Sequence, residues 1–197
     1  MFTGIIETLA KVEKIIKENS NVHFTFSSSI TSQLKIDQSV SHNGICLTVV
    51  GIDHNEYTVT AIKETLDRTN LGELIVGNFV NLERCMPATG RFDGHIVQGH
   101  VDTTGKCVDL KNLDGSWEFT FEYDKNHKNI TVEKGSICIN GVSLTVVKST
   151  ANQFSVCIIP YTFENTNFKN IAKGSVVNLE FDIIGKYLAK LTEQRTS

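Results

Sequence analysis

The sequence predicts an all-β protein: two tandem, similar six-stranded antiparallel Greek-key barrels followed by a C-terminal α-helix. Three observations predict this architecture. Residues 39–83 align with residues 136–180 at a constant offset of 97, and the two stretches are identical at 18 of 45 positions, far more than chance would give. Each copy holds about six short stretches of strand character, separated by turn residues. After the second copy, DIIGKYLAKLTEQ has the apolar spacing of a helix.

The earlier parts of the two repeats align at an offset of 95. MFTGIIETLAKV lies over IVQGHVDTTGKC, which places Gly4 on Gly99, and HFTF at 23–26 lies over EFTF at 118–121. One repeat therefore begins at Met1 and the other near Ile96, without a Pro- or Gly-rich linker between them. We expect an N-terminal barrel over 1–95, a C-terminal barrel over 96–184 and a helix over 185–197.

Each repeat is expected to open with a strand after Gly4 or Gly99. IIETLAKVEKII alone would suit a helix, but its counterpart HVDTTGKCVDL carries Thr, Thr and Gly in the middle, which disfavours one. A second strand follows in HFTFSS and in WEFTFEY, where aromatic and polar residues alternate. Both opening segments are therefore interpreted as strands.

A hairpin comes next. In the first repeat, ICLTVVGI and NEYTVTAI flank the turn cluster at 53–55; in the second, VSLTVVKS and QFSVCII flank 150–152. The stretches KETLDRTNLG and YTFENTNFKN predict a short helix in each copy. FVNLERC and VVNLEFD are the closing strands. Six short strands in about 97 residues indicate a small antiparallel barrel.

The predicted C-terminal helix has one apolar stripe, formed by Ile183, Ile184, Tyr187, Leu188 and Leu191 in DIIGKYLAKLTEQ. The stripe could dock on the helix's own barrel. Packing against copies from other subunits is the alternative that we favour, because each small barrel should already be closed by its own strands.

Composition excludes several function classes. The formal net charge is −3, the pI is about 6.1, and no block of five basic residues occurs, so a nucleic-acid footprint is not predicted. No apolar run is long enough to cross a membrane, and the N-terminus lacks the basic start of a secretory signal. The five cysteines form no C-x-x-C pair, which argues against a zinc site or a disulfide framework. We expect a cytoplasmic protein with reduced thiols.

The segments MFTGIIE, NGICLTV, KETLDRTNLG, GRFDGHIVQGHVD, NGVSLTV and IPYT, taken in order, closely resemble the riboflavin synthase family of the alpha-subunit type, which has two lumazine-binding barrels. The resemblance covers nearly the whole chain. It implies a dismutation of two molecules of 6,7-dimethyl-8-ribityllumazine, in which one donates a four-carbon unit to the other, giving riboflavin and 5-amino-6-(D-ribitylamino)uracil. It implies no metal and no organic cofactor.

The resemblance also implies an assembly. Members of this family are homotrimers held by C-terminal helices, and two substrate molecules meet between the N-terminal barrel of one subunit and the C-terminal barrel of a neighbour. Association with lumazine synthase is left open. A reaction that uses one compound twice would explain why the chain offers the same pocket twice.

The substrate-binding residues implied by the resemblance fall into two sets, of which about half the side chains should point away from the ligand because strands alternate. The N-terminal pocket takes Cys46, Leu47, Thr48, Thr60, Ala61, Ile62, Lys63, Glu64, Thr65, Gly99, His100 and Val101. The C-terminal pocket takes Gly4, Ile5, Ile6, Ser143, Leu144, Thr145, Cys157, Ile158, Ile159, Pro160, Tyr161 and Thr162. Outside these two sets, Lys134 matches a lysine that reaches in from another subunit, and Asp182 could fix a ribityl hydroxyl. Asp182 could instead cap the final helix.

Five residues are expected to take part in catalysis. Cys46, whose counterpart is Ser143, would hold or assist a nucleophile near the ring, or would be only a small buried strand residue. His100 would move protons near neutral pH, and His95 is expected to be structural. Ser39, Phe2 and Thr3 complete the expected set; Ser39 is the weakest, because Ser136 occupies the same place in the other repeat.

Two other functions remain alternatives. A non-catalytic carrier of lumazine or flavin, such as an optical antenna protein, would keep a pocket without its reactive groups. An oligonucleotide-binding barrel would share the small Greek-key architecture, but the acidic balance and the single tryptophan, Trp117, argue against it.

Overall fold

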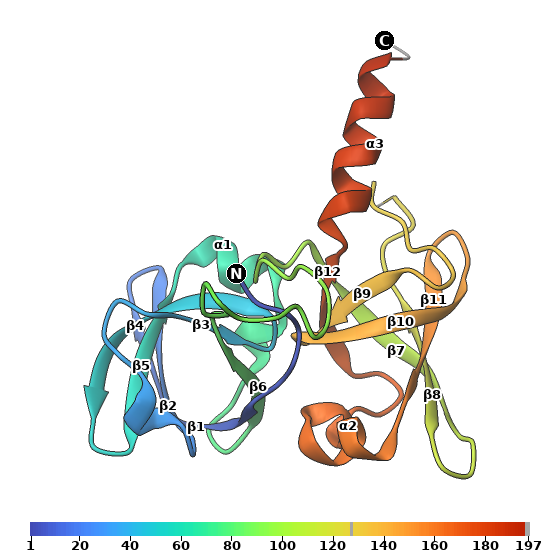
Figure 1. Ribbon diagram of the computed structural model, residues 1–197. Coiled ribbons are helices and arrows are strands. Elements are labelled where there is room, and N and C mark those ends of the chain that lie inside the picture. Colours follow the sequence, from blue (N-terminus) through green and yellow to red (C-terminus); the bar gives the residue numbers. More distant parts are fainter. Residues whose placement is uncertain (127, 196–197) are drawn as a thin grey trace.

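The computed structural model describes residues 1–126 and 128–195 and consists of two barrels lying side by side, with one helix extending from them (Figure 1). Each barrel is closed by six antiparallel strands, which confirms the predicted fold class. The strand order is β1-β2-β5-β4-β3-β6 in the first barrel. Followed from β7, the second barrel runs β7-β8-β11-β10-β9-β12, so the two topologies are the same.

The strands and the paired short helices of the two barrels correspond, and the 3₁₀ helix η1 (Thr31–Gln33) occurs only in the first barrel among the described residues. In the first barrel the elements are β1 (Thr8–Glu18), β2 (Asn21–Ser27), η1, β3 (Ser39–His42), β4 (Ile45–Asp53), β5 (Glu56–Ala61), α1 (Lys63–Arg68), η2 (Asn70–Glu73) and β6 (Phe79–Arg84). In the second they are β7 (Thr103–Asn112), β8 (Trp117–Glu122), β9 (Ser136–Ile139), β10 (Val142–Ser149), β11 (Gln153–Ile158), α2 (Pro160–Asn165), η3 (Asn167–Asn170) and β12 (Val176–Phe181). The helix α3 (Ile183–Arg195) follows.

Alternation of side chains places one face of a strand such as β2 in the barrel core. In β2, Val22, Phe24 and Phe26 are buried while the residues between them are partly exposed. The segment TLAKVEKIIKE, whose apolar spacing also suits a helix, is the strand β1, because it pairs on one side with β2 and on the other with β6. Long-range pairing therefore overrides local propensity here.

Two Asn-Gly turns meet where the barrels touch. Asn43–Gly44 joins β3 to β4 and Asn140–Gly141 joins β9 to β10; all four residues have positive φ, as a two-residue hairpin turn requires. A Cβ on Gly44 would lie 2.8 Å from the backbone nitrogen of Gly141, so only glycine permits this approach. The turns thus bring the two barrels into direct backbone contact.

Buried asparagine side chains connect the barrels around these turns. The Asn81 amide nitrogen donates to the Asn140 carbonyl at 2.8 Å and to Asn167 Oδ1 at 2.9 Å. In the other direction, the Asn178 amide donates to the Asn43 carbonyl at 2.9 Å. Because these bonds are buried and cross between domains, they fix how one barrel sits on the other.

The helix α3 projects away from both barrels (Figure 1). Its apolar residues Ile184, Tyr187, Leu188 and Leu191 are each more than half exposed, so this stripe is not covered by the chain's own barrel. Over the residues described, no helix is both long and apolar enough to span a membrane.

Candidate functional site

The opening segment of each repeat crosses to the barrel of the other repeat. The Gly99 carbonyl accepts the Cys46 N–H of β4 at 2.8 Å, and the Gly4 carbonyl accepts the Ser143 N–H of β10 at 2.8 Å. Val101 packs against the core of the first barrel, whereas Ile6 packs against the core of the second. Each candidate pocket is therefore built from both repeats.

Close packing makes these crossings specific to glycine. Gly4 and Gly99 have φ of +78° and +80°, the left-handed region that glycine tolerates best. A Cβ on Gly99 would lie 2.6 Å from Cβ of Cys46, and one on Gly4 would lie 2.6 Å from Cβ of Ser143. Cys46 and Ser143, which differ between the repeats, thus occupy equivalent places.

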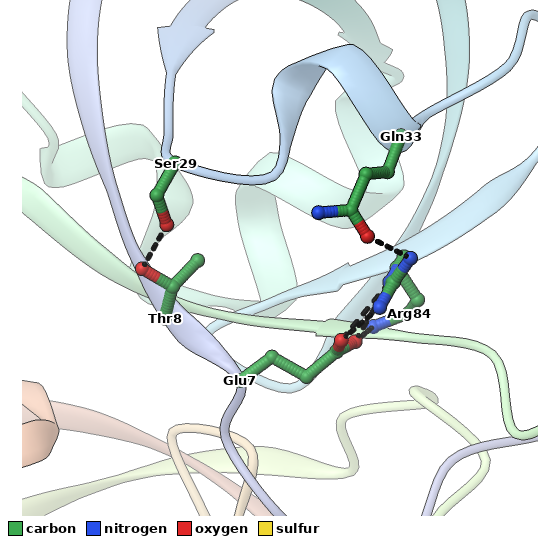
Figure 2. A network of polar contacts seen from close by, with 5 residues as sticks. All are labelled: Glu7, Thr8, Ser29, Gln33 and Arg84. Atoms are coloured by element: carbon green, nitrogen blue, oxygen red, sulfur yellow. Dashed lines mark hydrogen bonds and ion pairs between the residues drawn. The ribbon is translucent and has the colours of Figure 1, made fainter.

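A second pair of contacts ties each opening segment to its own barrel. Glu7 accepts the backbone N–H of Arg84, at the end of β6, at 2.7 Å, and also binds the guanidinium of Arg84. Figure 2 shows this ion pair beside Gln33 of η1, which accepts from the other side of the same guanidinium. Asp102 is the counterpart of Glu7; it accepts the Phe181 N–H at 2.9 Å and pairs with Lys186 of α3 at 2.6 Å.

The predicted pocket residues on and next to the strands divide into those that face outward and those that face a barrel core. Cys46, Thr48, Thr60 and Ile62 alternate with buried positions and face outward from the first barrel. Ser143, Thr145, Cys157 and Ile159 do the same on the second barrel. Three predicted residues instead belong to the barrel cores, where only their backbone could reach a ligand: Leu47, Ala61 and Ile158. Leu144, although only partly buried, also packs against the second core.

Short helices border both outward faces. Lys63, Glu64 and Thr65 open α1, and Pro160, Tyr161 and Thr162 open α2. Tyr161 is 74% exposed in the chain and Ile62 is 54% exposed. The apolar and aromatic side chains at these edges therefore lack cover within a single chain.

An open hollow of about 600 Å³ brings together several predicted residues of the first pocket. Glu64 of the first repeat and His100 and Val101 of the second line it, together with Asp102 and with Lys186 of α3. A hollow of about 460 Å³ is lined by Thr3, Ile5 and Cys85, and one of about 490 Å³ by Asp182 and the first turns of α3.

Cys46 lies in an apolar setting. It packs with Phe2, Val97, Cys85 and Cys138, and Phe2 is fully buried. Burial raises the pKa of the Cys46 thiol, while a hydrogen bond with Ser39 and the N-terminal ammonium act in the opposite direction. The neutral thiol is therefore the form to expect at neutral pH.

Ser143 has a polar setting instead. Its hydroxyl lies 2.7 Å from Nδ1 of His95, whose backbone N–H donates to the Thr3 carbonyl. Burial lowers the pKa of His95, and the nearby Asp182 carboxylate acts against this. Asp182 also accepts the Ile184 N–H at 3.0 Å, so it caps α3. His95 thus contacts a predicted pocket residue, which its place in the sequence had not indicated.

Lys134 lies apart from these groups. It occupies the tight turn before β9 with φ of +64°, its N–H donates to the Val146 carbonyl, and its side chain is exposed. Among the described residues, no hydrogen bond or ion pair joins it to either pocket.

Sequence reasoning missed two buried glutamates. Glu83 of β6 accepts from Thr3 N at 2.7 Å and Gly4 N at 3.0 Å, and Glu180 of β12 accepts from Gln98 N, Gly99 N and His100 N. They are an identical pair in the NLE motif that ends the repeat. The sequence signal that could have identified them is a charged residue at the same position in both closing strands.

Over the residues described, no cluster of three or more ligating side chains could hold a metal ion.

A family profile matches most of the chain. The profile describes the lumazine binding domain and matches twice, over residues 3–85 and 98–182. These two matches coincide with the two barrels and include both crossing segments.

Curated relatives match along most of their length. The chain is 42% identical over 189 residues to a riboflavin synthase of Actinobacillus pleuropneumoniae, covering 95% of this chain and 88% of the relative. It is 39% identical over 201 residues to a riboflavin synthase of Bacillus amyloliquefaciens, covering 100% of this chain and 94% of the relative.

Solved structures share the fold at lower identity. LumP complexed with 6,7-dimethyl-8-(1'-D-ribityl) lumazine superposes with a TM-score of 0.83 at 23% identity, covering 91% of this chain and 98% of that chain. LumP complexed with riboflavin gives a TM-score of 0.84 at 25% identity, covering 92% and 99%.

Proposed function

Because this chain belongs to the riboflavin synthase family, with two lumazine-binding domains, and is therefore an enzyme, we propose that it dismutates 6,7-dimethyl-8-ribityllumazine. One molecule gives up a four-carbon unit and leaves as 5-amino-6-(D-ribitylamino)uracil. The other receives that unit and becomes riboflavin. One substrate is oxidised and the other reduced, so the reaction needs no outside oxidant or reductant.

The observation that carries the proposal is the duplicated crossing. Gly99 pairs with Cys46 and Gly4 pairs with Ser143 at the same distance, so the two pockets share one backbone arrangement and carry different side chains. Pockets with one backbone arrangement suit two molecules of one compound. The different side chains suit molecules with different chemical parts, one donor and one acceptor of carbon.

Each pocket offers the groups that a lumazine needs. The substrate has a uracil-like edge, an apolar dimethyl edge and a polyol chain. Strand backbone would pair with the uracil edge, and the hydroxyls of Thr48, Thr60 and Thr145 would bind ribityl oxygens. Ile62 and Ile159, exposed at the pocket edges, would cover the ring faces.

We assign the chemistry to the first pocket. Cys46 would act as a neutral thiol beside the ring, held near Ser39, and His100 would move the proton of the acidic 7-methyl group. Phe2 and Thr3 would close the site, because Phe2 is buried against Cys46 and Thr3 is held by Glu83. In the second pocket, Ser143 beside His95 and Asp182 would hold the partner molecule.

We further propose that the pockets work between subunits. Their side chains are exposed in one chain and the apolar stripe of α3 is uncovered, so a homotrimer built on α3, with Lys134 reaching a neighbour's pocket, would complete the site. Association with lumazine synthase stays an open part of this proposal. The cytoplasm, where thiols stay reduced, is the compartment that we propose, since all five cysteines are free.

A single-substrate assay tests the proposal. Purified protein given only 6,7-dimethyl-8-ribityllumazine should develop riboflavin fluorescence, with one pyrimidine product formed for each riboflavin. A carrier would purify yellow or fluorescent with ligand bound and would leave added lumazine unchanged. That second result would reject the enzyme in favour of a carrier such as LumP, a function that the higher identity to riboflavin synthases disfavours.

A further inference from the structure

Glu180 makes an unusual set of contacts for a buried carboxylate. It lies on β12 opposite Cys138 and is 3% exposed. Oε1 accepts from Gln98 N at 2.6 Å, and Oε2 accepts from Gly99 N and His100 N at 2.9 Å each. Three consecutive backbone donors therefore converge on one side chain, which fixes the path of the segment 98–100.

That segment carries two of the groups assigned to the reaction. His100 is its last residue, and the Gly99 carbonyl accepts the N–H of Cys46. Because Gly99 packs within van der Waals contact of Cys46 and Phe2, a shift of the segment would move His100 relative to the Cys46 thiol. Displacements of this kind cost rate even when every side chain is retained.

We propose that Glu180 is the positioning residue of the first pocket: its ionised carboxylate holds His100 and Cys46 in their working arrangement, and its protonation releases them. The inference rests on the function proposed above. It adds a control of that site by pH, through a residue that touches no substrate.

The electrostatic surroundings favour titration in the physiological range. Burial raises the pKa of Glu180 to about 7, against the backbone hydrogen bonds from Gln98 and His100. The charged and titratable groups that face it are Lys186 of α3, Asp102, Cys138 of β9 and Cys46 of β4. Lys186 lowers the pKa of Glu180 and Asp102 raises it, and these two groups pair with each other.

Protonation of Glu180 would weaken its hold on the segment 98–100, because a protonated carboxyl has less capacity to accept hydrogen bonds. An ionised carboxylate can accept from all three N–H groups, but a protonated one has an O–H where one acceptor was. The neutral carboxyl accepts these hydrogen bonds more weakly than the carboxylate does, and its O–H adds a donor among three N–H donors, so the contacts that hold the segment weaken. The segment 98–100 should therefore be held above about pH 7 and loosened below it.

Glu83 provides a matched control inside the same chain. It holds Thr3 and Gly4 as Glu180 holds 98–100, and the Gly4 carbonyl accepts the N–H of Ser143. It differs in receiving a side-chain bond from Thr3 Oγ1 at 3.0 Å. Glu83 therefore holds Thr3 and the segment beside the second pocket, and its hydrogen bonds go to residues 3 and 4 instead of 98–100.

The first test observes directly whether Glu180 holds the segment 98–100. Gln98–Gly99 is the only Gln–Gly pair in the chain, so labelling with ¹³C-carbonyl Gln and ¹⁵N Gly leaves one amide signal, that of Gly99, in a carbonyl-filtered NMR spectrum. In the unmodified chain this signal should titrate with a midpoint near 7, and in Glu180→Gln it should not. A signal that stays fixed over roughly 1.5 pH units on either side of this midpoint would overturn the proposal.

The second test measures the pH dependence of kcat. Activity of the unmodified enzyme should rise as the pH increases through 7, whereas Glu180→Gln should be lower by about tenfold to a hundredfold at pH 8 and flat across this window. KM should change little. Glu83→Gln should keep the rise through 7. An unchanged rise in Glu180→Gln, or the same flattening in both variants, would contradict the proposal.

A third readout separates this inference from the proposed function. The rate of Cys46 alkylation by iodoacetamide, followed by peptide mass mapping, rises steadily with pH as the thiolate forms. In the unmodified chain this rise should show a break near pH 7, and in Glu180→Gln the break should be absent. If the protein formed no riboflavin at all, the function would fail while the amide and alkylation measurements would still decide whether Glu180 holds this segment. Absence of the break from both proteins would overturn the positioning role.

Discussion

At the scale of single residues, the informative positions are those where the two repeats differ. Cys46 and Ser143 occupy equivalent places beside the crossing glycines, yet one has apolar neighbours and the other is hydrogen-bonded to His95. In the same way, His42 and Tyr57 stand where the second barrel has Ile139 and Phe154. The fold accommodates either residue at each of these positions, so the effect of each difference can be tested by replacing a residue with its counterpart from the other repeat.

The first prediction concerns the two pocket residues. Cys46→Ser should lower kcat by at least about tenfold, because it removes the thiol from the pocket to which we assign the chemistry. Ser143→Ala should act mainly on KM, because that pocket is assigned to holding the second molecule. Steady-state kinetics with lumazine as the only substrate measure both, and equal losses of kcat would remove the distinction between the pockets.

The second prediction concerns the buried pair His42 and Tyr57, which lie 2.8 Å apart between His42 Nε2 and the phenol oxygen. Burial lowers the pKa of His42 to about 4. The unfolded chain therefore binds the proton first as the pH falls, and the folded state loses stability between pH 6.5 and 4. The loss between pH 7 and pH 5 should be about 2 kcal/mol.

The variant His42→Ile with Tyr57→Phe copies the pair found in the second barrel and should lack this loss. Urea unfolding of both proteins at the two pH values, at one protein concentration, measures the difference. Glu180 changes stability in the opposite sense in this range, since its pKa is raised, but it is present in both proteins and cancels. The same pH dependence in both proteins would show that His42 does not titrate on unfolding.

At the scale of elements, the Asn-Gly turns and the asparagines around them join the barrels. Asn81 donates to the carbonyl of Asn140 and to Asn167, and its own oxygen accepts the Asn167 N–H at 2.7 Å. All three residues are buried. Their contacts therefore determine how the crossing segments reach the opposite barrel.

The third prediction follows from this junction. Asn81→Ala should lower the free energy of unfolding by about 2 to 3 kcal/mol, because buried donors and acceptors lose their partners. Asn55→Ala, in an exposed turn, is the control and should change it by less than about 0.5 kcal/mol. Similar values for the two variants, measured by urea unfolding, would mean that the junction contributes little to stability.

The helices and strands could be predicted from the sequence more fully than the contacts between them. The repeat allowed β1 to be identified as a strand although IIETLAKVEKII alone is ambiguous, because β7 has the same place and cannot be a helix. The short strands β3 and β9 were not delimited, although the Asn-Gly turn after each is a strong hairpin signal. The contacts of Glu180 and His95 join residues far apart in the chain, and no local pattern reports such contacts.

At the scale of the whole molecule, the two barrels leave their pockets open to the outside and α3 leaves its apolar stripe uncovered. Both features have one explanation if copies of the chain associate. The face of β2 that enters the core could be anticipated from the alternation of residues, whereas the direction in which α3 leaves the barrels (Figure 1) could not, because no local sequence pattern reports it.

The fourth prediction tests this association. Deleting residues from Gly185 onward should reduce a trimer to monomers in light scattering, but the deletion also removes Lys186, which pairs with Asp102. Leu188→Ser with Leu191→Ser is the sharper variant, since both side chains are more than half exposed on α3. Lys190→Ser with Glu193→Ser, changed on the same helix, should keep the mass of the unmodified protein. A trimer that survives the leucine changes would exclude α3 as its contact.

The most direct test of the central claim is a crystal structure of the protein with an unreactive analogue of 6,7-dimethyl-8-ribityllumazine. We predict two analogue molecules for each chain, one against the outward face of β4 at Cys46 and Thr48, the other against β10 at Ser143 and Thr145. A single analogue bound elsewhere, or one inside a barrel core, would contradict the account that the duplicated barrels exist to hold one compound twice.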